Sequence, residues 1–190
     1  MTRCRVLLLP GWLDSDAGHW QSHWERLHGW RRVTQSDWLW PKRGDWMARL
    51  EEVLLESDGP AVLVAHSLGC HLVAAWAAQS QHTARVRGAL LVAPPDIERD
   101  DMPPHLQAWR PILRQRLPFP ATAVTSEDDP YGGVQAGARL AREWGARQIA
   151  LGACGHINGQ SGLGDWAAGQ AWVDELAAAP AAHPPLRQAP

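Results

Sequence analysis

The stretch Val64-Ala65-His66-Ser67-Leu68-Gly69-Cys70 joins two segments of different character. The apolar residues 61–65 have the length and composition of a strand buried on both faces, whereas residues 68–79 have the length and spacing of an apolar helix. Small residues lie two positions before and two positions after Ser67, although Ala65 stands where glycine is usual. They allow the chain to turn sharply and a substrate to approach the serine. We interpret the stretch as a nucleophile elbow, a tight strand-to-helix turn that exposes a serine.

The helix that follows Ser67 would bring its positive dipole and its free N–H groups to the place where a negatively charged oxygen forms during attack by the serine. A serine before a helix can also be a simple N-cap, whose hydroxyl accepts a hydrogen bond from the helix. The buried strand before Ser67 and Gly69 after it favour the nucleophile.

The alternation of strand and helix continues along the whole chain. Strands are predicted at residues 5–9, 32–36, 61–65, 88–93, 122–125 and 147–151, and helices at residues 19–27, 45–55, 68–79, 105–117, 133–144 and 163–178. Six strands, each followed by a helix, predict an α/β protein: a three-layer α/β/α sandwich with a six-stranded, mostly parallel sheet. We expect a single domain over residues 1–179 and a frayed, proline-containing tail over residues 180–190.

Length and charge exclude several classes of protein. The chain has 190 residues, of which 45% are hydrophobic, so it can build a core without disulfides or a structural metal. Its 18 basic and 20 acidic residues give a net charge of −2, which leaves no positive surplus for a nucleic-acid partner. No apolar stretch approaches the ~18 residues of a membrane span, and we expect no membrane partner.

The cysteines and histidines give no sign of a metal site. Cys4, Cys70 and Cys154 are an odd number without metal-type spacing, which favours a reduced, cytoplasmic setting. His19 and His23 are four residues apart on a predicted helix, but no glutamate lies at the position that zinc peptidases use and no third ligand is evident. We expect no metal and no cofactor, and we interpret Cys70 and Cys154 as packing residues.

Two further side chains of catalytic type follow the last two predicted strands. The fifth strand is followed by the sequence SEDDPY and the sixth by GACGHIN. In a parallel sheet the carboxyl ends of the strands meet at one edge, where reactive groups gather. A serine nucleophile needs a base, and the base needs an orienting acid. The order along the chain predicts Ser67 as nucleophile, His156 as base and Asp129 as acid, with Asp128 as the alternative acid.

Several further motifs, together with the short length, resemble one group of enzymes. The chain contains Pro10-Gly11-Trp12, Gly18-His19-Trp20-Gln21, Trp24-Glu25 and Asp128-Asp129-Pro130. These motifs resemble the small serine hydrolases related to retinoblastoma-binding protein 9, within the α/β-hydrolase superfamily, and the resemblance extends to about Ala178. It implies a compact α/β-hydrolase fold without the superfamily's first two antiparallel strands and without a cap domain.

The resemblance also implies roles for individual residues. It favours Asp129 over Asp128, because the acid of these enzymes directly precedes the proline. It assigns the oxyanion hole to the backbone N–H groups of Leu68 and Trp12. The first predicted strand should lie beside the third, which would bring Trp12 to the elbow.

Trp12, His19, His66 and Tyr131 are the candidates for the wall of the substrate pocket. His66 precedes Ser67, and because adjacent residues on a strand point to opposite faces we do not expect it to be the base. The chain has 12 tryptophans against one tyrosine and one phenylalanine, and seven of the tryptophans lie at or before position 46. Such a concentration predicts either a flat apolar pocket or core packing, with Trp12 as the one tryptophan expected in the site.

The combined features predict a cofactor-free serine hydrolase that cleaves carboxylic esters of small apolar substrates through an acyl-enzyme. An amidase or aminopeptidase would use the same three residues, and a non-catalytic binding module could keep the fold with a vestigial triad. The expected partner is a small-molecule ester or amide, and the sequence identifies no protein partner.

Overall fold

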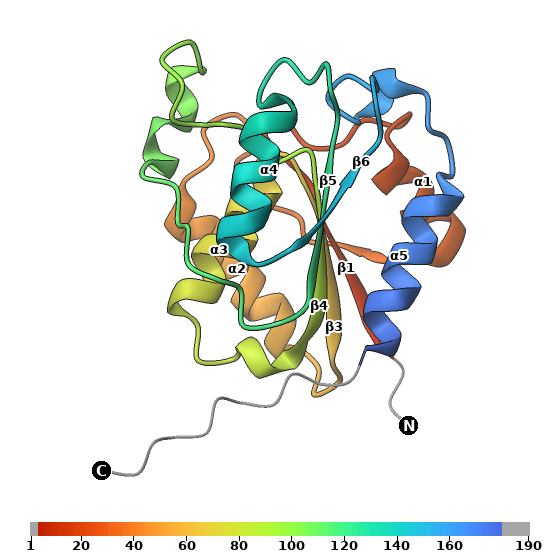
Figure 1. Ribbon diagram of the computed structural model, residues 1–190. Helices are drawn as coiled ribbons and strands as arrows, with labels where there is room; N and C mark the ends of the chain where they lie inside the picture. Colours follow the sequence, from red (N-terminus) through yellow and green to blue (C-terminus); the bar gives the residue numbers. More distant parts are fainter. Residues whose placement is uncertain (1–3, 180–190) are drawn as a thin grey trace.

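A sheet of six parallel strands lies at the centre of the molecule, whose computed structural model describes residues 4–179 (Figure 1). The strands are β1 (Arg5–Leu9), β2 (Arg31–Arg32), β3 (Ala61–His66), β4 (Val86–Val92), β5 (Ala121–Thr125) and β6 (Arg147–Ala150). They lie in the order β2-β1-β3-β4-β5-β6, and every neighbouring pair is parallel. The predicted six-stranded α/β/α sandwich is confirmed. β1 lies beside β3, as the predicted oxyanion hole requires.

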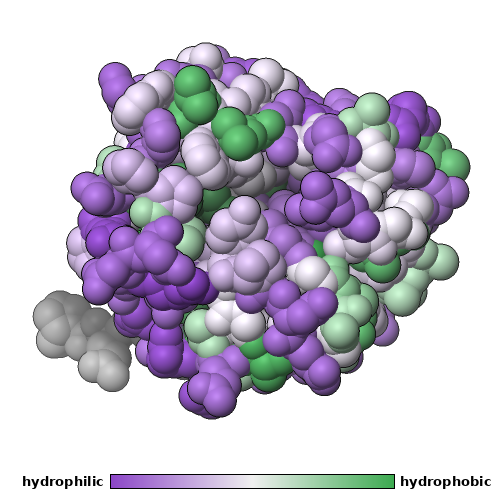
Figure 2. Space-filling model, turned by 90° about the horizontal axis from the view of Figure 1, so that it is seen from above, coloured by the Kyte–Doolittle hydropathy of each residue, from purple (hydrophilic) through white to green (hydrophobic). Residues whose placement is uncertain are grey.

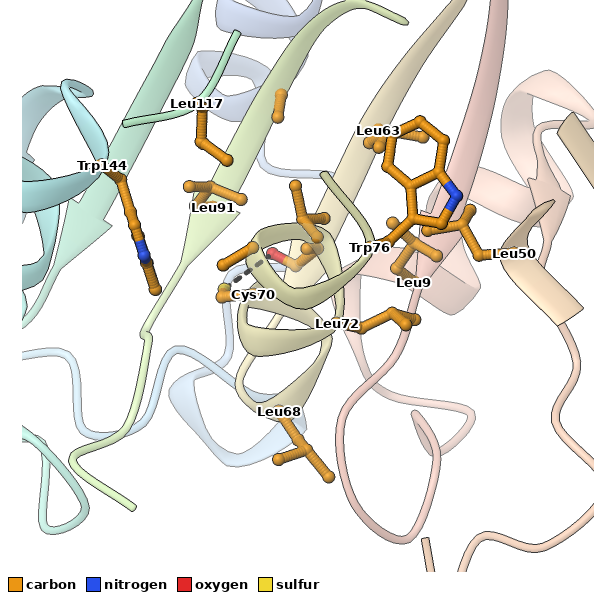
Figure 3. Close-up of a cluster of buried hydrophobic side chains, with 14 of the residues drawn as sticks. Leu9, Leu50, Leu63, Leu68, Cys70, Leu72, Trp76, Leu91, Leu117 and Trp144 are labelled. Atoms are coloured by element: carbon orange, nitrogen blue, oxygen red, sulfur yellow. Dashed lines mark hydrogen bonds between the residues drawn. The ribbon is translucent and has the colours of Figure 1, made fainter. Parts of the chain in front are cut away.

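Helices cover both faces of the sheet (Figure 1). One face carries α1 (Trp20–His28) and α5 (Ala167–Ala178), and the other carries α2 (Arg43–Leu55), α3 (Leu68–Gln79) and α4 (Gly133–Trp144). Side chains along β1 alternate between the two layers, because successive residues of a strand point to opposite faces. Val6 and Leu8 pack with α1 and α5, whereas Leu7 and Leu9 pack with α2 and α3. Figure 3 shows Leu9 with Leu63 and Trp76 in the hydrophobic core between the sheet and the layer of α2, α3 and α4.

The predicted helix at residues 105–117 is wrong. Only a short 3-10 helix, η2 (Pro104–Trp109), forms there, and the chain then continues without helix or strand as far as β5. Arg110 is extended, with φ −81 and ψ 148. The ring of Pro111 disfavours the helical conformation for the residue before it, and Pro111 has no N–H to donate. Two further 3-10 helices are η1 (Thr83–Arg85) and η3 (Gly159–Ser161).

Most other predicted boundaries lie within two residues of those in the structure, but two elements are clearly shorter than predicted. The strand predicted at residues 32–36 is reduced to Arg31–Arg32, with one further hydrogen bond from the Val33 N–H to the Leu8 oxygen at 2.9 Å. β2 is an edge strand that pairs on one side only, so few bonds keep the following residues extended. The helix predicted at residues 163–178 begins only at Ala167, because Trp166 has a left-handed conformation with φ 41.

Three further expectations concern the C-terminal tail, a membrane span and a metal site. The predicted frayed tail, residues 180–190, lies outside the described residues. Between residues 4 and 179, none of the helices is both long and apolar enough to cross a membrane. The same residues contain no group of three or more side chains suited to hold a metal ion.

Candidate active site

Ser67 lies at the sharp turn between β3 and α3. Its backbone has φ 53 and ψ −122, a conformation that a non-glycine residue adopts only when the surroundings enforce it. Two glycines make the turn possible. A Cβ on Gly69 would lie 2.3 Å from the Leu9 oxygen, and a Cβ on Gly11 would lie 2.7 Å from the Ser67 Cβ. The Ser67 hydroxyl makes no capping hydrogen bond to α3, so the serine is not a simple N-cap.

The Ser67 hydroxyl instead contacts His156, in the loop after β6. The distance from Ser67 Oγ to His156 Nε2 is 2.8 Å. His156 Nδ1 lies 2.9 and 3.0 Å from the two carboxylate oxygens of Asp129. Because the carboxylate can only accept, Nδ1 carries the hydrogen and Nε2 is left to accept the serine proton. Both side chains are shielded, with 10% of His156 and 4% of Asp129 exposed. The structure brings together the three predicted residues in a hydrogen-bonded chain.

Asp128 has a different set of contacts from its neighbour Asp129. Its Oδ1 accepts hydrogen bonds from the Gly155 N–H at 2.7 Å and from the Ser126 hydroxyl at 2.9 Å. The Ser126 oxygen in turn accepts the Cys154 N–H at 2.9 Å. These donors hold the pKa of Asp128 below its usual value. Asp128 therefore ties the loop after β5 to the loop that carries His156, and makes no hydrogen bond to the imidazole.

The backbone N–H groups of Trp12 and Leu68 lie on the two segments that meet at Ser67. Neither group finds an acceptor among residues 4–179, and both residues line the same pocket as Ser67. Leu68 is the first residue of α3, where N–H groups have no partner within the helix. Two unpaired donors beside a serine are the arrangement that stabilises a negatively charged oxygen.

Ser67 opens into a pocket of about 470 Å³ at the carboxyl ends of the strands. All four predicted pocket residues, Trp12, His19, His66 and Tyr131, line it. Figure 2 shows this face, which is hollowed and carries both hydrophobic and hydrophilic residues. The Tyr131 ring lies edge-on to His156, with the ring centres 4.6 Å apart.

His19 and His66 are buried and neutral. Burial lowers the pKa of His19 to about 3, and it lowers the pKa of His66 well below its ordinary value. His66 Nε2 lies 2.9 Å from the backbone oxygen of His156, so this nitrogen donates. His66 makes no hydrogen bond to Ser67 among the described residues, in line with the prediction that it is not the base. The contact with the loop of His156 was not predicted.

Several residues that line the pocket were not predicted from the sequence. The additional lining residues that matter for the shape and charge of the site are Asp16, Pro95, Met102, Leu106 and Asn158. Asn158 and Asp16 belong to loops that follow β6 and β1, so their position after a strand was a usable signal. Leu106 gave no such signal, because residues 105–117 were predicted to form a helix, and Met102 lies outside all the predicted strands and helices.

The comparisons with known proteins identify the family and the fold. Residues 6–175 match the model of a protein family described as serine hydrolase. The chain belongs to this serine hydrolase family. None of the curated proteins compared with this serine hydrolase matches it.

Solved structures of α/β hydrolases share the fold of this serine hydrolase. A YdeN-like hydrolase from Pectobacterium atrosepticum is 29% identical, with a TM-score of 0.81, and the match covers 92% of this chain and 91% of that one. The ydeN gene product of Bacillus subtilis is 19% identical, with a TM-score of 0.72 and coverage of 91% and 98%. An esterase from Rhodococcus sp. ECU1013 is 15% identical, with a TM-score of 0.64 and coverage of 91% and 91%.

Most tryptophans of this serine hydrolase pack away from the pocket. Trp12 is the one tryptophan that lines it, whereas Trp20, Trp24 and Trp46 are fully buried in the core. Trp40 is 56% exposed, and its ring packs against His105, which stacks on Trp12. The tryptophans before position 47 therefore mainly build the core, as one of the two alternatives predicted.

The two cysteines near the site pack against the protein core. Cys70 is buried in the core shown in Figure 3, and burial raises the pKa of its thiol well above the ordinary value. Its sulfur lies 3.4 Å from the Val92 oxygen. Cys154 lies 3.5 Å from the Leu151 oxygen. Both side chains pack as expected, and Ser67 occupies the elbow.

Proposed function

We propose that this serine hydrolase cleaves carboxylic esters of small apolar acyl groups, with Ser67 as nucleophile, His156 as base and Asp129 as orienting acid. The observation that carries the proposal is the 2.8 Å contact between Ser67 Oγ and His156 Nε2 inside the pocket. A serine hydroxyl is a weak nucleophile until a base accepts its proton, and this contact provides the base.

The reaction has two halves. Ser67 Oγ attacks the ester carbon while its proton passes to His156 Nε2. The ester C–O bond then breaks, the acyl group stays on Ser67, and His156 gives the proton to the departing alkoxide, which leaves as an alcohol. Water repeats the sequence on the acyl-enzyme and releases the carboxylic acid. Asp129 keeps the hydrogen on Nδ1 and stabilises the imidazolium that forms in each half.

The negative charge that develops on the carbonyl oxygen would be bound by the N–H groups of Trp12 and Leu68. Loss of one such donor typically costs ~2.7–4 kcal/mol of barrier lowering. Because both donors belong to the backbone, replacing the Trp12 side chain would test packing in the pocket rather than the oxyanion hole.

Part of the pocket favours an apolar acyl group. Trp12, Met102 and Leu106 line it together and belong to, or pack against, the core on the α2 and α3 side. An apolar acyl chain placed against these side chains would leave water, which is favourable in proportion to the area buried. The closer kinship with the hydrolases related to retinoblastoma-binding protein 9 remains a prediction that rests on the sequence motifs.

The proposal is tested by the hydrolysis of p-nitrophenyl butyrate. We expect the native protein to release p-nitrophenol and Ser67→Ala to lose this activity while it stays folded by circular dichroism. Ser36→Ala, which alters an exposed serine at the edge of the sheet, is the matched control and should retain activity. Turnover that persists in Ser67→Ala, or a folded native protein without any turnover, would reject the proposal; the second result would favour a binding module. Aminoacyl p-nitroanilides in the same assay compare amide cleavage with ester cleavage.

A further inference from the structure

The pocket beside Ser67 has two unlike walls. The apolar wall of Trp12, Met102 and Leu106 packs with the core on the face of the sheet that carries α2, α3 and α4. The opposite wall is polar and comes from residues next to Trp20 and Ile157, which belong to the core on the face of α1 and α5. The catalytic serine lies at the edge of the sheet between these two layers.

The polar wall lies on the His156 side of the serine. The ring of His19 contacts the ring of His66, with centres 4.6 Å apart, and His66 contacts His156, with centres 4.9 Å apart. Asp16 belongs to the same wall. Its carboxylate lies close to Gly159, in the loop that carries His156. A Cβ added to Gly159 would be only 2.6 Å from Asp16 Oδ1.

The side of His156 is the side of the leaving group, because this residue must protonate the departing alcohol. This assignment rests on the proposed function. The acyl group then extends toward the apolar wall, and the alcohol part of the ester lies against Asp16 and His19.

The polar wall carries the negative charge of Asp16, which forms no ion pair with the described residues. No lysine or arginine lines the pocket. The carboxylate of Asp14 is compensated by Arg32 at 2.7 Å, whereas Asp16 has no ion pair with any residue between 4 and 179; its Oδ1 accepts only the Gly18 N–H at 2.8 Å. Burial keeps the pKa of His19 near 3, so this histidine adds no positive charge at neutral pH.

His19 gives a second, independent sign that this wall receives a polar ligand. Its Nδ1 accepts the Gln21 N–H at 3.1 Å, which places the ring hydrogen on Nε2. His19 is only 2% exposed, and Nε2 has no hydrogen-bond partner among the described residues. A buried donor without an acceptor is unfavourable, and the alcohol oxygen of the ester would satisfy it, whereas an ammonium group, which has no lone pair, would not.

We propose that the polar wall binds the positively charged alcohol part of the substrate, so that this hydrolase prefers apolar acyl esters of amino alcohols. Ser67 takes the acyl group, and the ester C–O bond breaks. The amino alcohol leaves with the proton that His156 delivers, its ammonium group facing the carboxylate of Asp16.

Three butyrate esters that share the acyl group and differ in the charge of the alcohol test this preference. Butyrylcholine is cationic, 3,3-dimethylbutyl butyrate has the same shape without charge, and 3-sulfopropyl butyrate is anionic. Because Asp16 is exposed, we expect kcat/KM for butyrylcholine to exceed that for the neutral ester by about twofold to fivefold. The anionic ester should be the slowest of the three.

Asp16→Asn should bring the ratio of the cationic to the neutral ester down to about 1, since it removes the charge and keeps the shape. The matched control is Asp58→Asn, which removes the same charge from a fully exposed side chain before β3, at the opposite ends of the strands; it should keep the native ratio. A native ratio near 1, or a ratio that survives in Asp16→Asn, overturns the inference and leaves the hydrolase intact. If none of the three esters is cleaved and a fluorophosphonate does not label Ser67, the proposed function fails and this inference fails with it.

Discussion

Replacing Gly69 with alanine should damage catalysis more than folding. The new Cβ would lie 2.3 Å from the Leu9 oxygen and 2.9 Å from the Pro10 oxygen, whereas ordinary contacts begin at 3.4 Å. Both partners are backbone atoms, so no flexible side chain can yield, and the start of α3 must move away from the loop after β1 by about 1 Å. These two segments carry the N–H groups of Leu68 and Trp12.

The magnitude follows from the oxyanion hole. Separating its two donors weakens one of the hydrogen bonds, and loss of one donor costs about 10²–10³-fold in kcat. A displacement of about 1 Å in a catalytic geometry has an effect of about 10²-fold. We therefore expect kcat/KM on p-nitrophenyl butyrate to fall about 100-fold in Gly69→Ala, with a loss of ~1–3 kcal/mol in the free energy of unfolding from overpacking.

The assay compares kcat/KM with the folded fraction, measured by circular dichroism at the same temperature. Gly44→Ala is the matched control, because Gly44 lies in α2 and a Cβ there meets nothing within 4 Å. This control should keep full activity. Loss of an oxyanion donor would lower kcat/KM by far more than about twofold. If folded Gly69→Ala stays within about twofold of the native kcat/KM, the claim that Gly69 holds the two donors in place is refuted.

The other predictions concern the two aspartates and a buried histidine. Asp129→Asn should lower kcat by about 10⁴-fold, because the amide cannot hold His156 in the tautomer that accepts the serine proton. Asp128→Asn keeps an oxygen acceptor for the Gly155 N–H, so its kcat should fall by less than about tenfold; equal losses in the two variants would contradict the assignment. Burial lowers the pKa of His71 to about 4, so the unfolded chain takes up this proton first as the pH falls from 6.5 toward 4, and stability declines across that window by up to ~3 kcal/mol. Urea unfolding at pH 7 and pH 4.5 should show a smaller difference in His71→Gln, and an unchanged difference would count against the argument.

The sequence predicted elements well where local signals define both ends. Residues 68–79 and 133–144 are helical as predicted. α4 ends at Gly145, which has φ 70, a conformation that glycine adopts without strain. The strand β1 also has its predicted bounds.

The segment between β4 and β5 could not be predicted in the same way, because distant contacts determine its path. The Arg110 guanidinium donates to the Ile97 oxygen at 2.7 Å, and the Trp109 indole donates to the Pro41 oxygen at 2.8 Å. Periodicity contains no information on such partners. The apolar wall formed by Met102 and Leu106 was missed for this reason.

The same distinction applies to the site. Ser67, Asp129 and His156 were predictable because each follows a strand of a parallel sheet, and the topology alone brings strand ends to one edge. The position of Asp16 after β1 was a usable signal, but its closeness to Gly159, more than a hundred residues later in the chain, depends on how the two loops pack and could not be predicted.

The most direct measurement of the central claim is the mass of the protein after treatment with a fluorophosphonate, followed by peptide mapping. The account predicts one adduct per chain, located on Ser67, and none in Ser67→Ala or in native protein first inactivated at the same serine by another organophosphonate. A folded native protein that remains unlabelled, or an adduct on any other residue, would contradict the claim that Ser67 is the activated nucleophile.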